Sequence, residues 1–286
     1  MQIAFGSLAV EGKLAMSPAF GVKPESLAMM RILGGALVFV PANLLWGGSR
    51  LRSARGWATM ATLSLFGIVL NQALFLRGLS LTSPVSATLL VATIPVMTAL
   101  VSVLVGKDKL HASSALGFVV AVLGVVVLSG FAVPHAGDAF VLLNALSYAV
   151  YVVYSKGALA EHGTLAVMAW VFGLGTLLFA PVGAVSLIHD APRWSAGTIG
   201  LVAFVVLVPT VLAYGVNAWA LRRASPMLVT TYVYLQPLIV VALAAVQLGQ
   251  TPTTQALLGG MCVLAGVAIV VRGQQARDRQ TRRNAL

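Results

Sequence analysis

Three ionisable side chains lie inside long apolar stretches of the sequence: Glu11, Lys13 and Arg31. A charge at the centre of a lipid bilayer costs ~2.5 to 3.5 kcal/mol on insertion scales, so each of these residues needs a partner or a function. Glu11 is the carboxylate placed well inside such a stretch, which makes it the candidate for a proton-coupling group. The alternatives are an ion pair of Glu11 with Lys13 or Arg31, and a position of Glu11 near water.

Polar and aromatic side chains recur at helical spacing within the apolar stretches. Asn144, Tyr148, Tyr151 and Ser155 share one face of a helix, because residues 4, 7 and 11 positions apart lie on the same side. Their hydroxyl and amide groups would offer a solute both apolar contact and hydrogen bonds, although bonds to neighbouring helices are the alternative use. Further candidates to line a cavity are Asn71, Gln72, Tyr214, Asn217, Tyr232 and Gln236.

The sequence contains no set of residues typical of an enzyme. Metalloprotease, serine-hydrolase and P-loop motifs are absent, and no pair of aspartates lies inside the apolar stretches. The four histidines fall near predicted loops without clustering, and Cys262 is the one cysteine, so we expect neither a metal site nor a disulfide. We therefore predict no catalytic residues and no cofactor.

The composition indicates that lipid is the solvent of this chain. Of its 286 residues 59% are apolar and 9% charged, and the mean hydropathy is +0.96. The net charge of +11 would suggest a nucleic-acid partner if the basic residues shared one face. They fall instead in short clusters between apolar stretches, so we expect membrane lipid as a partner and no nucleic acid.

About ten apolar stretches approach the length that a transmembrane helix needs. Crossing the hydrocarbon core takes ~20 residues, because the core is ~30 Å thick and each residue rises ~1.5 Å. The stretches cover residues 2–16, 26–46, 57–78, 84–105, 112–131, 138–158, 164–188, 197–220, 226–248 and 254–272. The first is short for a full crossing. The sequence therefore predicts an all-α integral membrane protein.

Basic residues are concentrated in alternate connections between these stretches. With the N-terminus inside, thirteen of them fall in the inside loops and the C-terminal tail, whereas the outside loops hold Lys23, Arg77 and Arg193. This positive-inside bias predicts a multi-pass protein of the cell (inner or plasma) membrane with both termini in the cytoplasm. Residues 273–286 would form a basic cytoplasmic tail.

The sequence contains an internal repeat. A shift of 142 positions superposes Ser83 on Ser225, Pro84 on Pro226, Thr88 on Thr230, Pro95 on Pro237, Gly117 on Gly259 and Gly124 on Gly266. Each copy, residues 1–131 and 138–272, contains five apolar stretches. Because five is odd, the second copy would enter the membrane inverted, as in many secondary transporters.

The aligned prolines and glycines have different physical roles. A proline in a span deletes a backbone hydrogen bond and kinks the helix, so Pro95 and Pro237 are candidate hinges. Gly117 and Gly124, with Gly259 and Gly266, would allow close packing of helices within the chain. A homodimer interface is the alternative use of these glycines.

Residues 71–130 resemble the repeat of the EamA family of the drug/metabolite transporter (DMT) superfamily; they read NQALFLRGLSLTSPVSATLLVATIPVMTALVSVLVGKDKLHASSALGFVVAVLGVVVLSG. Residues 213–272 resemble the same repeat. Gly6 and Ser7 fall where the family tends to carry a Gly-Ser-Asn motif, although Leu8 replaces the asparagine. Lys13 and Arg31 match a lysine and an arginine of its first two helices, whereas Gln250 stands where a glutamate is usual.

The resemblance implies a secondary transporter that exports small metabolites, such as amino acids or related compounds, or drugs. We expect alternating access around a cavity between two inverted five-helix repeats, with a small-molecule solute as partner. Because no nucleotide-binding motif is present, the energy would come from an ion gradient or from the solute's own gradient. A truncated or accessory membrane protein without transport activity is the alternative, because the first stretch is short.

Overall fold

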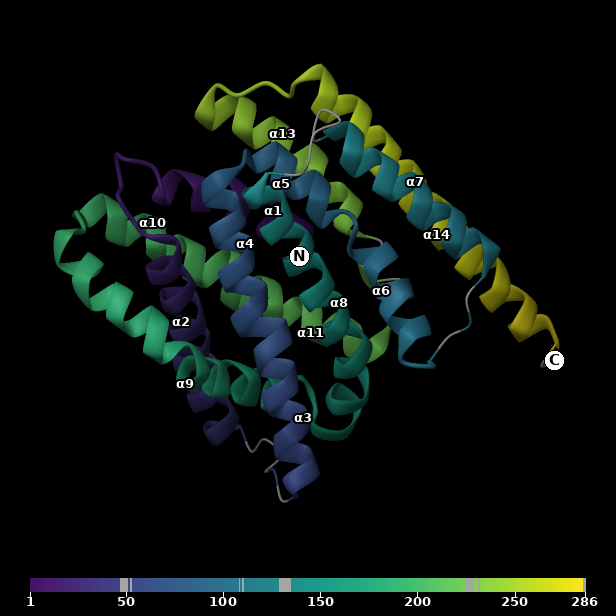
Figure 1. Cartoon of the computed structure of the whole chain (residues 1–286). Coiled ribbons are helices and arrows are strands. Elements are labelled where there is room, and N and C mark those ends of the chain that lie inside the picture. The colour runs from purple at the N-terminus through teal and green to yellow at the C-terminus, as the bar shows by residue number, and fades with distance from the viewer. Residues whose placement is uncertain are drawn as a thin grey trace.

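The structure analysed is a computed structural model, which describes residues 1–46, 51, 53–107, 109, 111–128, 135–224, 229–230 and 232–284, apart from the side chains of residues 234, 274 and 277–284. Within this part of the chain every regular element is a helix, and no strand is present (Figure 1). The predicted all-α fold is therefore confirmed.

The elements fall into two successive groups. The first contains α1 (Gln2–Ala15), α2 (Pro24–Leu45), α3 (Ala54–Ser64), the π-helical turn η1 (Leu65–Val69), α4 (Leu70–Leu81), α5 (Pro84–Val91), α6 (Ile94–Leu104) and α7 (Ala112–Leu128). The second contains α8 (Ala136–His162), α9 (Thr164–Asp190), the 3-10 turn η2 (Ala191–Arg193), α10 (Ala196–Val206), the π-helical turn η3 (Leu207–Leu212), α11 (Ala213–Arg223), the 3-10 turn η4 (Tyr232–Tyr234), α13 (Leu235–Leu248) and α14 (Thr254–Asn284).

Among the described residues, seven helical segments are long and apolar enough to cross a membrane. They are Pro24–Leu45, Ala54–Leu81, Pro84–Leu104, Ala136–His162, Thr164–Arg193, Ala196–Arg223 and Thr254–Gly273. Helices α7 and α13 are apolar but shorter. Helix α1 has 14 residues, which at ~1.5 Å per residue is shorter than the ~30 Å hydrocarbon core. The chain is thus a multi-pass membrane protein.

Two features differ from the predicted spans. Helix α14 continues to Asn284 instead of ending near residue 272, because the sequence after it is rich in Gln, Ala and Arg, which are good helix formers. Pro95 and Pro237 do not kink continuous helices. Pro95 lies in the first turn of α6, after a turn at residues 92–93, and Pro237 is the third residue of α13, after η4.

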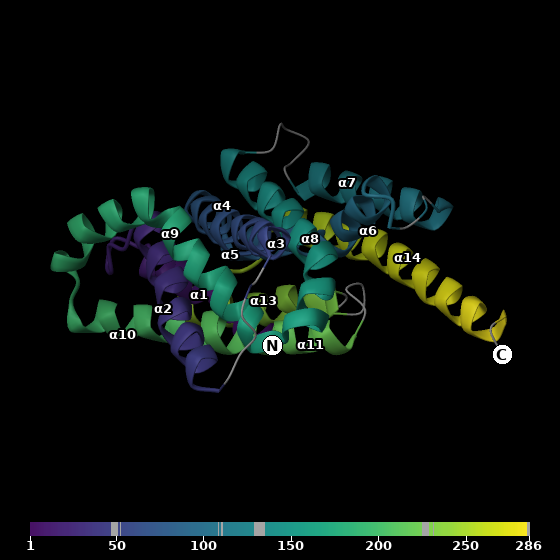
Figure 2. The same ribbon diagram turned by 90° about the horizontal axis from the view of Figure 1, so that it is seen from below.

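Helices α7 and α14 lie side by side at one end of the molecule, whereas α2, α9 and α10 lie at the other end (Figures 1 and 2). Glycine lets α7 and α14 approach closely. A Cβ atom built on Gly117 would lie 2.5 Å from the carbonyl oxygen of Gly266, and one on Gly124 2.8 Å from that of Gly259. The glycine faces are therefore in contact within the chain, so a homodimer would need another surface.

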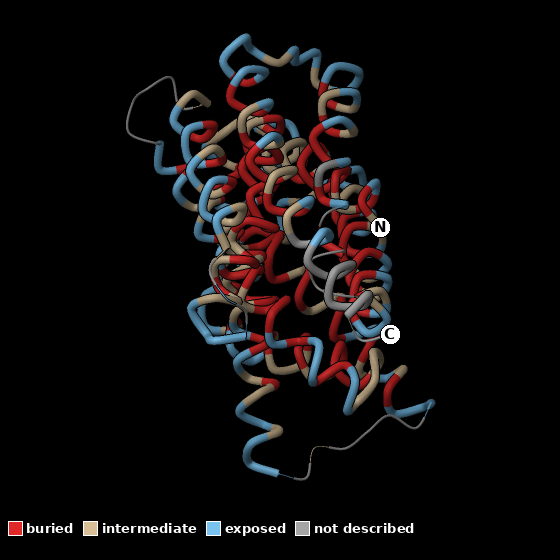
Figure 3. Tube along the Cα trace, turned by 90° about the vertical axis from the view of Figure 1, so that its right-hand side faces the viewer, coloured by how far each residue is buried: buried red, intermediate tan, exposed pale blue. Residues whose placement is uncertain are grey.

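Buried residues run through the centre of the helix bundle, and exposed ones lie on its outside and at its ends (Figure 3). Several of the exposed side chains are large and apolar, such as Leu44, Leu104 and Val246. A water-soluble protein rarely exposes many such side chains, whereas lipid accepts them. The outer surface therefore fits a membrane environment.

The second group of elements repeats the first at a distance of 142 residues. Helices α3 and α10 begin 142 positions apart, as do the π-helical turns η1 and η3 that follow them. Even the helix caps correspond, because Ser53 accepts a bond from the Gly56 N–H at 3.0 Å and Ser195 accepts one from the Thr198 N–H at 3.1 Å. The predicted shift thus recurs in the local structure.

Candidate functional site

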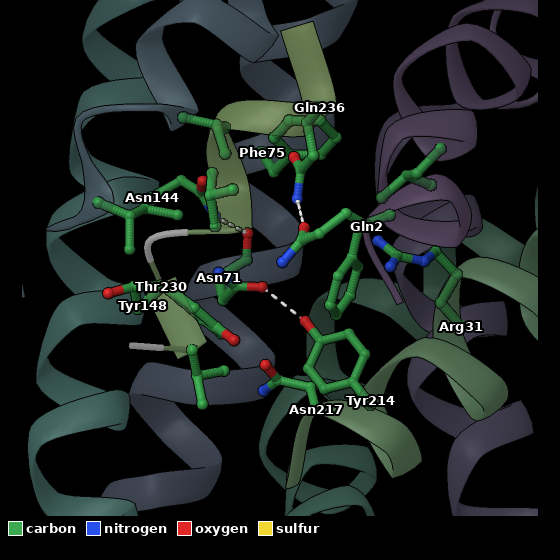
Figure 4. Close-up of a pocket in the computed structure, with 16 residues that line it drawn as sticks. Gln2, Arg31, Asn71, Phe75, Asn144, Tyr148, Tyr214, Asn217, Thr230 and Gln236 are labelled. Atoms are coloured by element: carbon green, nitrogen blue, oxygen red, sulfur yellow. Dashed lines mark hydrogen bonds between the residues drawn. The ribbon is translucent and has the colours of Figure 1, made fainter. Parts of the chain in front are cut away.

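A cavity of about 70 Å³ lies among α1, α2, α4, α5, α6, α8, α11 and the segment leading into α13 (Figure 4). A water molecule needs ~10–15 Å³ of such space, so the cavity has room for several. Its wall consists of Gln2, Phe5, Leu8, Arg31, Asn71, Phe75, Val91, Ile94, Asn144, Tyr148, Tyr214, Asn217, Val229, Thr230, Val233 and Gln236. Amides and phenols therefore share the wall with apolar side chains.

Asn71 is at the centre of the hydrogen bonds in the wall. The Tyr214 hydroxyl donates to the Asn71 side-chain oxygen at 2.6 Å, and the Asn144 amide donates to the Asn71 backbone carbonyl, also at 2.6 Å. On another side of the cavity, the Gln236 amide donates to the Gln2 side-chain oxygen at 2.5 Å (Figure 4). These bonds connect α4, α8 and α11, and α1 to α13.

The π-helical turn η3 provides the anchor for Arg31. Because Pro209 has no N–H group, the carbonyl of Val205 loses its usual helical partner, and the Thr210 hydroxyl donates to it at 2.9 Å. The Thr210 oxygen in turn accepts a bond from Arg31 Nε at 2.8 Å, and Arg31 Nη2 donates to the Pro209 carbonyl at 3.4 Å. The guanidinium group is thus held by neutral oxygens of α10–η3.

Arg31 is fully inside the protein, with 1% of its surface exposed. In the described part of the chain no carboxylate lies within ion-pair distance of it. The predicted alternative in which Glu11 pairs with Arg31 or Lys13 is therefore not seen among these residues. A buried guanidinium without a counter-ion is costly, and such groups mark functional sites in membrane proteins.

Several of the predicted cavity residues come together in this wall. They are Asn71, Asn144, Tyr148, Tyr214, Asn217 and Gln236, and Arg31 joins them. Tyr151 does not line the cavity: its ring packs on Gly67, where a Cβ atom would lie 2.2 Å from the Tyr151 ring, and its hydroxyl has no partner in the described structure. Tyr232 is not part of the wall, and 53% of its surface is exposed. Gln72 is buried outside the cavity wall.

The remaining predicted site residues lie away from the cavity wall. Lys13 Nζ donates to the carbonyls of Leu79, Ser80 and Thr82 at 3.0, 3.1 and 2.8 Å, which caps the end of α4. Glu11 is partly buried on α1, one turn beyond Leu8. Pro95 and Pro237 are buried near the cavity residues Ile94 and Gln236 but do not form its wall.

Sequence reasoning missed a part of the wall. Most of the missed residues are apolar and have no feature that separates them from core residues: Phe5, Leu8, Phe75, Val91, Ile94, Val229 and Val233. Gln2 and Thr230 were also missed. The shift of 142 would have found Gln2, because it corresponds to the predicted residue Asn144.

A bundle of helices long enough to cross lipid, with a polar cavity inside it, defines a class of multi-pass membrane transporters. Comparison with known proteins identifies the class more closely. The EamA-like transporter family matches residues 2–130 and again residues 135–272. The chain belongs to this family, as its resemblance predicted. The family consists of transporters, so the prediction that the protein is not an enzyme is confirmed.

Relatives extend over most of the chain. A protein of Archaeoglobus fulgidus named "Uncharacterized transporter" is 27% identical, over 88% of this chain and 89% of its own. A protein of Streptantibioticus cattleyicolor named "Probable terminal-alkyne amino-acid exporter" is 26% identical, over 91% and 88%. A solved crystal structure aligns with a TM-score of 0.63 at 20% identity, over 94% of this chain and 93% of that one, and shows the same fold.

Proposed function

We propose that this EamA-family protein is a secondary transporter that moves a small solute by alternating access between two inverted five-helix repeats, residues 1–131 and 138–272. The observation that carries the proposal is the position of the cavity between corresponding residues of the two repeats. Four pairs of wall residues lie 142 positions apart: Gln2 and Asn144, Phe75 and Asn217, Val91 and Val233, and Ile94 and Gln236. Such a position is typical of the substrate site of an alternating-access transporter.

The contacts between α7 and α14 support the inverted relation of the repeats. A Cβ atom on Gly117 would touch Gly266, and one on Gly259 would touch Gly124. Because Gly117 corresponds to Gly259 and Gly124 to Gly266, exchanging the repeats turns one contact into the other. The order of the contacts is antiparallel. A pair of helices related in this way is expected around a two-fold axis in the membrane plane.

The interruptions near Pro95 and Pro237 support a hinge role for these residues. Each follows a break in its helix, at residues 92–93 and at η4, next to the wall residues Ile94 and Gln236. Discontinuous helices at corresponding positions of two repeats are typical of transporters that rock around a central site. A change of angle at both breaks would open the cavity to one side and close it to the other.

The proposal also covers the orientation of the chain in the membrane, the direction of transport and the coupling ion. We propose that the ten apolar stretches of the sequence lie in the cell membrane with both termini in the cytoplasm, because the basic clusters lie in alternate connections. Export is the proposed direction, and amino acids, related metabolites or drugs the proposed solutes, since one relative is named an amino-acid exporter. Glu11, the carboxylate within α1, is the proposed proton-coupling group.

A solute panel tests this function directly. The chain is produced in a strain that lacks its own related exporters, and efflux of labelled amino acids, organic acids and amines is compared with that of cells without the chain. We expect export of at least one solute class, reduced at least tenfold by Asn71→Ala, because this change removes the acceptor of the Tyr214 hydroxyl.

The matched control is Tyr154→Phe on α8. Tyr154 is exposed, and the Lys107 ammonium lies 4.4 Å from its ring centre, a contact that phenylalanine keeps. This variant should export at the wild-type rate. Equal flux with and without the chain for all solutes, at confirmed expression, would contradict the proposed function.

A further inference from the structure

The cavity wall carries a positive charge that nothing in the wall neutralises. Among the described residues of the wall, Arg31 is the one ionised side chain, and none is an aspartate or a glutamate. Two nitrogens of Arg31 donate to neutral oxygens, of Thr210 and Pro209, and no carboxylate lies within ion-pair distance of the guanidinium group in the described part of the chain. Figure 4 shows the guanidinium group directed from α2 toward the cavity, near Gln2 and Tyr214. The site therefore has a positive potential.

A second buried donor lacks a partner at the same cavity. The side-chain amide nitrogen of Asn217 on α11 is buried and has no hydrogen-bond partner in the described part of the chain; 2% of the residue is exposed. A buried polar group without a partner costs ~1–3 kcal/mol unless a ligand satisfies it. Asn217 thus points to a ligand that brings a hydrogen-bond acceptor.

Three oxygens of the wall already accept a hydrogen bond from the protein. The Asn71 side-chain and backbone oxygens accept from Tyr214 and Asn144, and the Gln2 oxygen accepts from Gln236. An ammonium group would find no carboxylate among the described wall residues to balance its charge. The positive charge of Arg31, without a carboxylate among the described wall residues, disfavours a cationic solute.

The rest of the wall is apolar. Phe5 and Leu8 come from α1, Phe75 from α4 and Ile94 from α6, and the Phe5 and Tyr214 rings meet edge to face at 5.4 Å. Aromatic and aliphatic walls of this kind bind the apolar body of a small molecule, while a few polar groups fix its orientation. A solute that suits this wall has an apolar body and one acidic end.

We infer that the cavity selects small amphiphilic monoanions, an apolar body with one carboxylate, and that Arg31 and the Asn217 amide bind the carboxylate. The inference rests on the proposed transport function and adds its substrate class. It predicts that amines of the same shape are rejected, because they would place a second positive charge beside Arg31.

The test is a binding series on the purified full chain in detergent, read by the thermal shift of its intrinsic tryptophan fluorescence. The probes share one body and differ in charge: 3-phenylpropionate, 3-phenylpropionamide and 3-phenylpropylamine. We expect wild type to bind the carboxylate at least tenfold more tightly than the amide, and the amine not measurably. A ligand that binds only the folded state raises its stability by RT ln(1 + [L]/Kd), so at equal concentration the tighter ligand gives the larger thermal shift.

Variants of Arg31 and Asn217 test whether these two residues cause the preference for the carboxylate. Arg31→Gln should lose at least tenfold in carboxylate affinity and bind the carboxylate and the amide equally. Asn217→Ala keeps the charge and should lose three- to tenfold. Arg193→Gln, which removes one charge from the exposed turn η2, is the matched control and should bind as wild type does. Size-exclusion profiles check that each variant is folded.

The possible results separate the inference from the proposed function. Binding of the amine or the amide as tightly as the carboxylate, or full carboxylate affinity in a folded Arg31→Gln variant, would overturn the inference. Absence of carboxylate binding by wild type would overturn it as well. The transport proposal would still stand if the solute panel showed export of neutral or cationic compounds, and it would fall if that panel showed none.

Discussion

The two halves of the molecule share one fold but differ in chemistry at the cavity. Ser53 and Ser195 cap equivalent helices, and the turns η1 and η3 interrupt equivalent rods. The position equivalent to Arg31 is nevertheless Gly173. The backbone can thus support a symmetric movement, while a single half provides the charge. The local structure thus recurs in both halves, whereas the charged group of the cavity wall comes from the first half alone.

The largest expected effect concerns the shared part of the fold. Gly266→Leu would drive a side chain into α7, because even a Cβ atom at this position would lie 2.5 Å from the Gly117 carbonyl oxygen and 2.6 Å from the Ala121 nitrogen. Overpacking of this kind costs ~1–3 kcal/mol or more, so we expect severe loss of folded protein. The measurement is the yield of monodisperse protein in size-exclusion chromatography.

The equivalent change Gly124→Leu should cause a loss of the same size, because the contacts of Gly124 mirror those of Gly266. Gly157→Leu on α8 is the matched control, since a Cβ atom there meets nothing within 4 Å. A normal yield for one of the two α7–α14 variants and a severe loss for the other would contradict the equivalence of Gly124 and Gly266 in the two halves.

The next effect concerns the charge that differs between the halves. In the double variant Arg31→Gly with Gly173→Arg, the guanidinium moves to the equivalent position of the second half. Its anchor is missing there, because Thr210 corresponds to Ile68, which has no hydroxyl group. We expect transport to stay at least tenfold below wild type, as in Arg31→Gly alone, in a flux assay. Recovery of wild-type flux would mean that the halves are chemically interchangeable.

A smaller effect concerns the hydrogen bond between the halves. Tyr214→Phe removes the donor to the Asn71 side-chain oxygen, a bond of 2.6 Å that joins α11 to α4. A single hydrogen bond contributes ~0.5–1.5 kcal/mol, so we expect a three- to tenfold loss of transport and a small decrease in thermal stability. Initial flux rates and melting temperatures measure the two effects. Unchanged flux would exclude this bond from the transport cycle.

The smallest effect on transport is expected for Lys13. Lys13→Met removes the ammonium group that bonds to three carbonyls at the end of α4. The free energy of unfolding should fall by about 1–2 kcal/mol, while the solute preference stays as in wild type, because Lys13 is not part of the cavity wall. Thermal melting and the probe series provide the measurements. A changed preference would place Lys13 in the solute pathway.

The sequence predicted the helical class and most helix bounds well, because the requirement for ~20 apolar residues in lipid leaves a strong periodic signal. Helix α9, for example, begins at the predicted residue 164 and ends at Asp190, two residues beyond the predicted end. The extension of α14 to Asn284 was missed, because hydropathy reports where lipid ends and not where a helix ends.

The candidate site was predictable only in part. Asn144 and Tyr148 share a helix face, and that face does line the cavity. Tyr151 follows on the same face, but the missing side chain of Gly67 lets its ring pack between helices instead. The hydrogen bonds that hold Arg31 could not be predicted from the sequence either. They depend on a π-helical turn around Pro209, which no local sequence pattern indicates. Contacts between distant helices decide both cases.

Alternating exposure of the central cavity is the claim on which the account depends, and cysteine accessibility tests it most directly. With Cys262 replaced by alanine, Val91→Cys and the equivalent Val233→Cys are reacted with a membrane-impermeant maleimide from each side of sealed vesicles. We expect labelling of both positions from both sides, and protection by a bound solute. Labelling from one side only, or none under conditions of active flux, would contradict it.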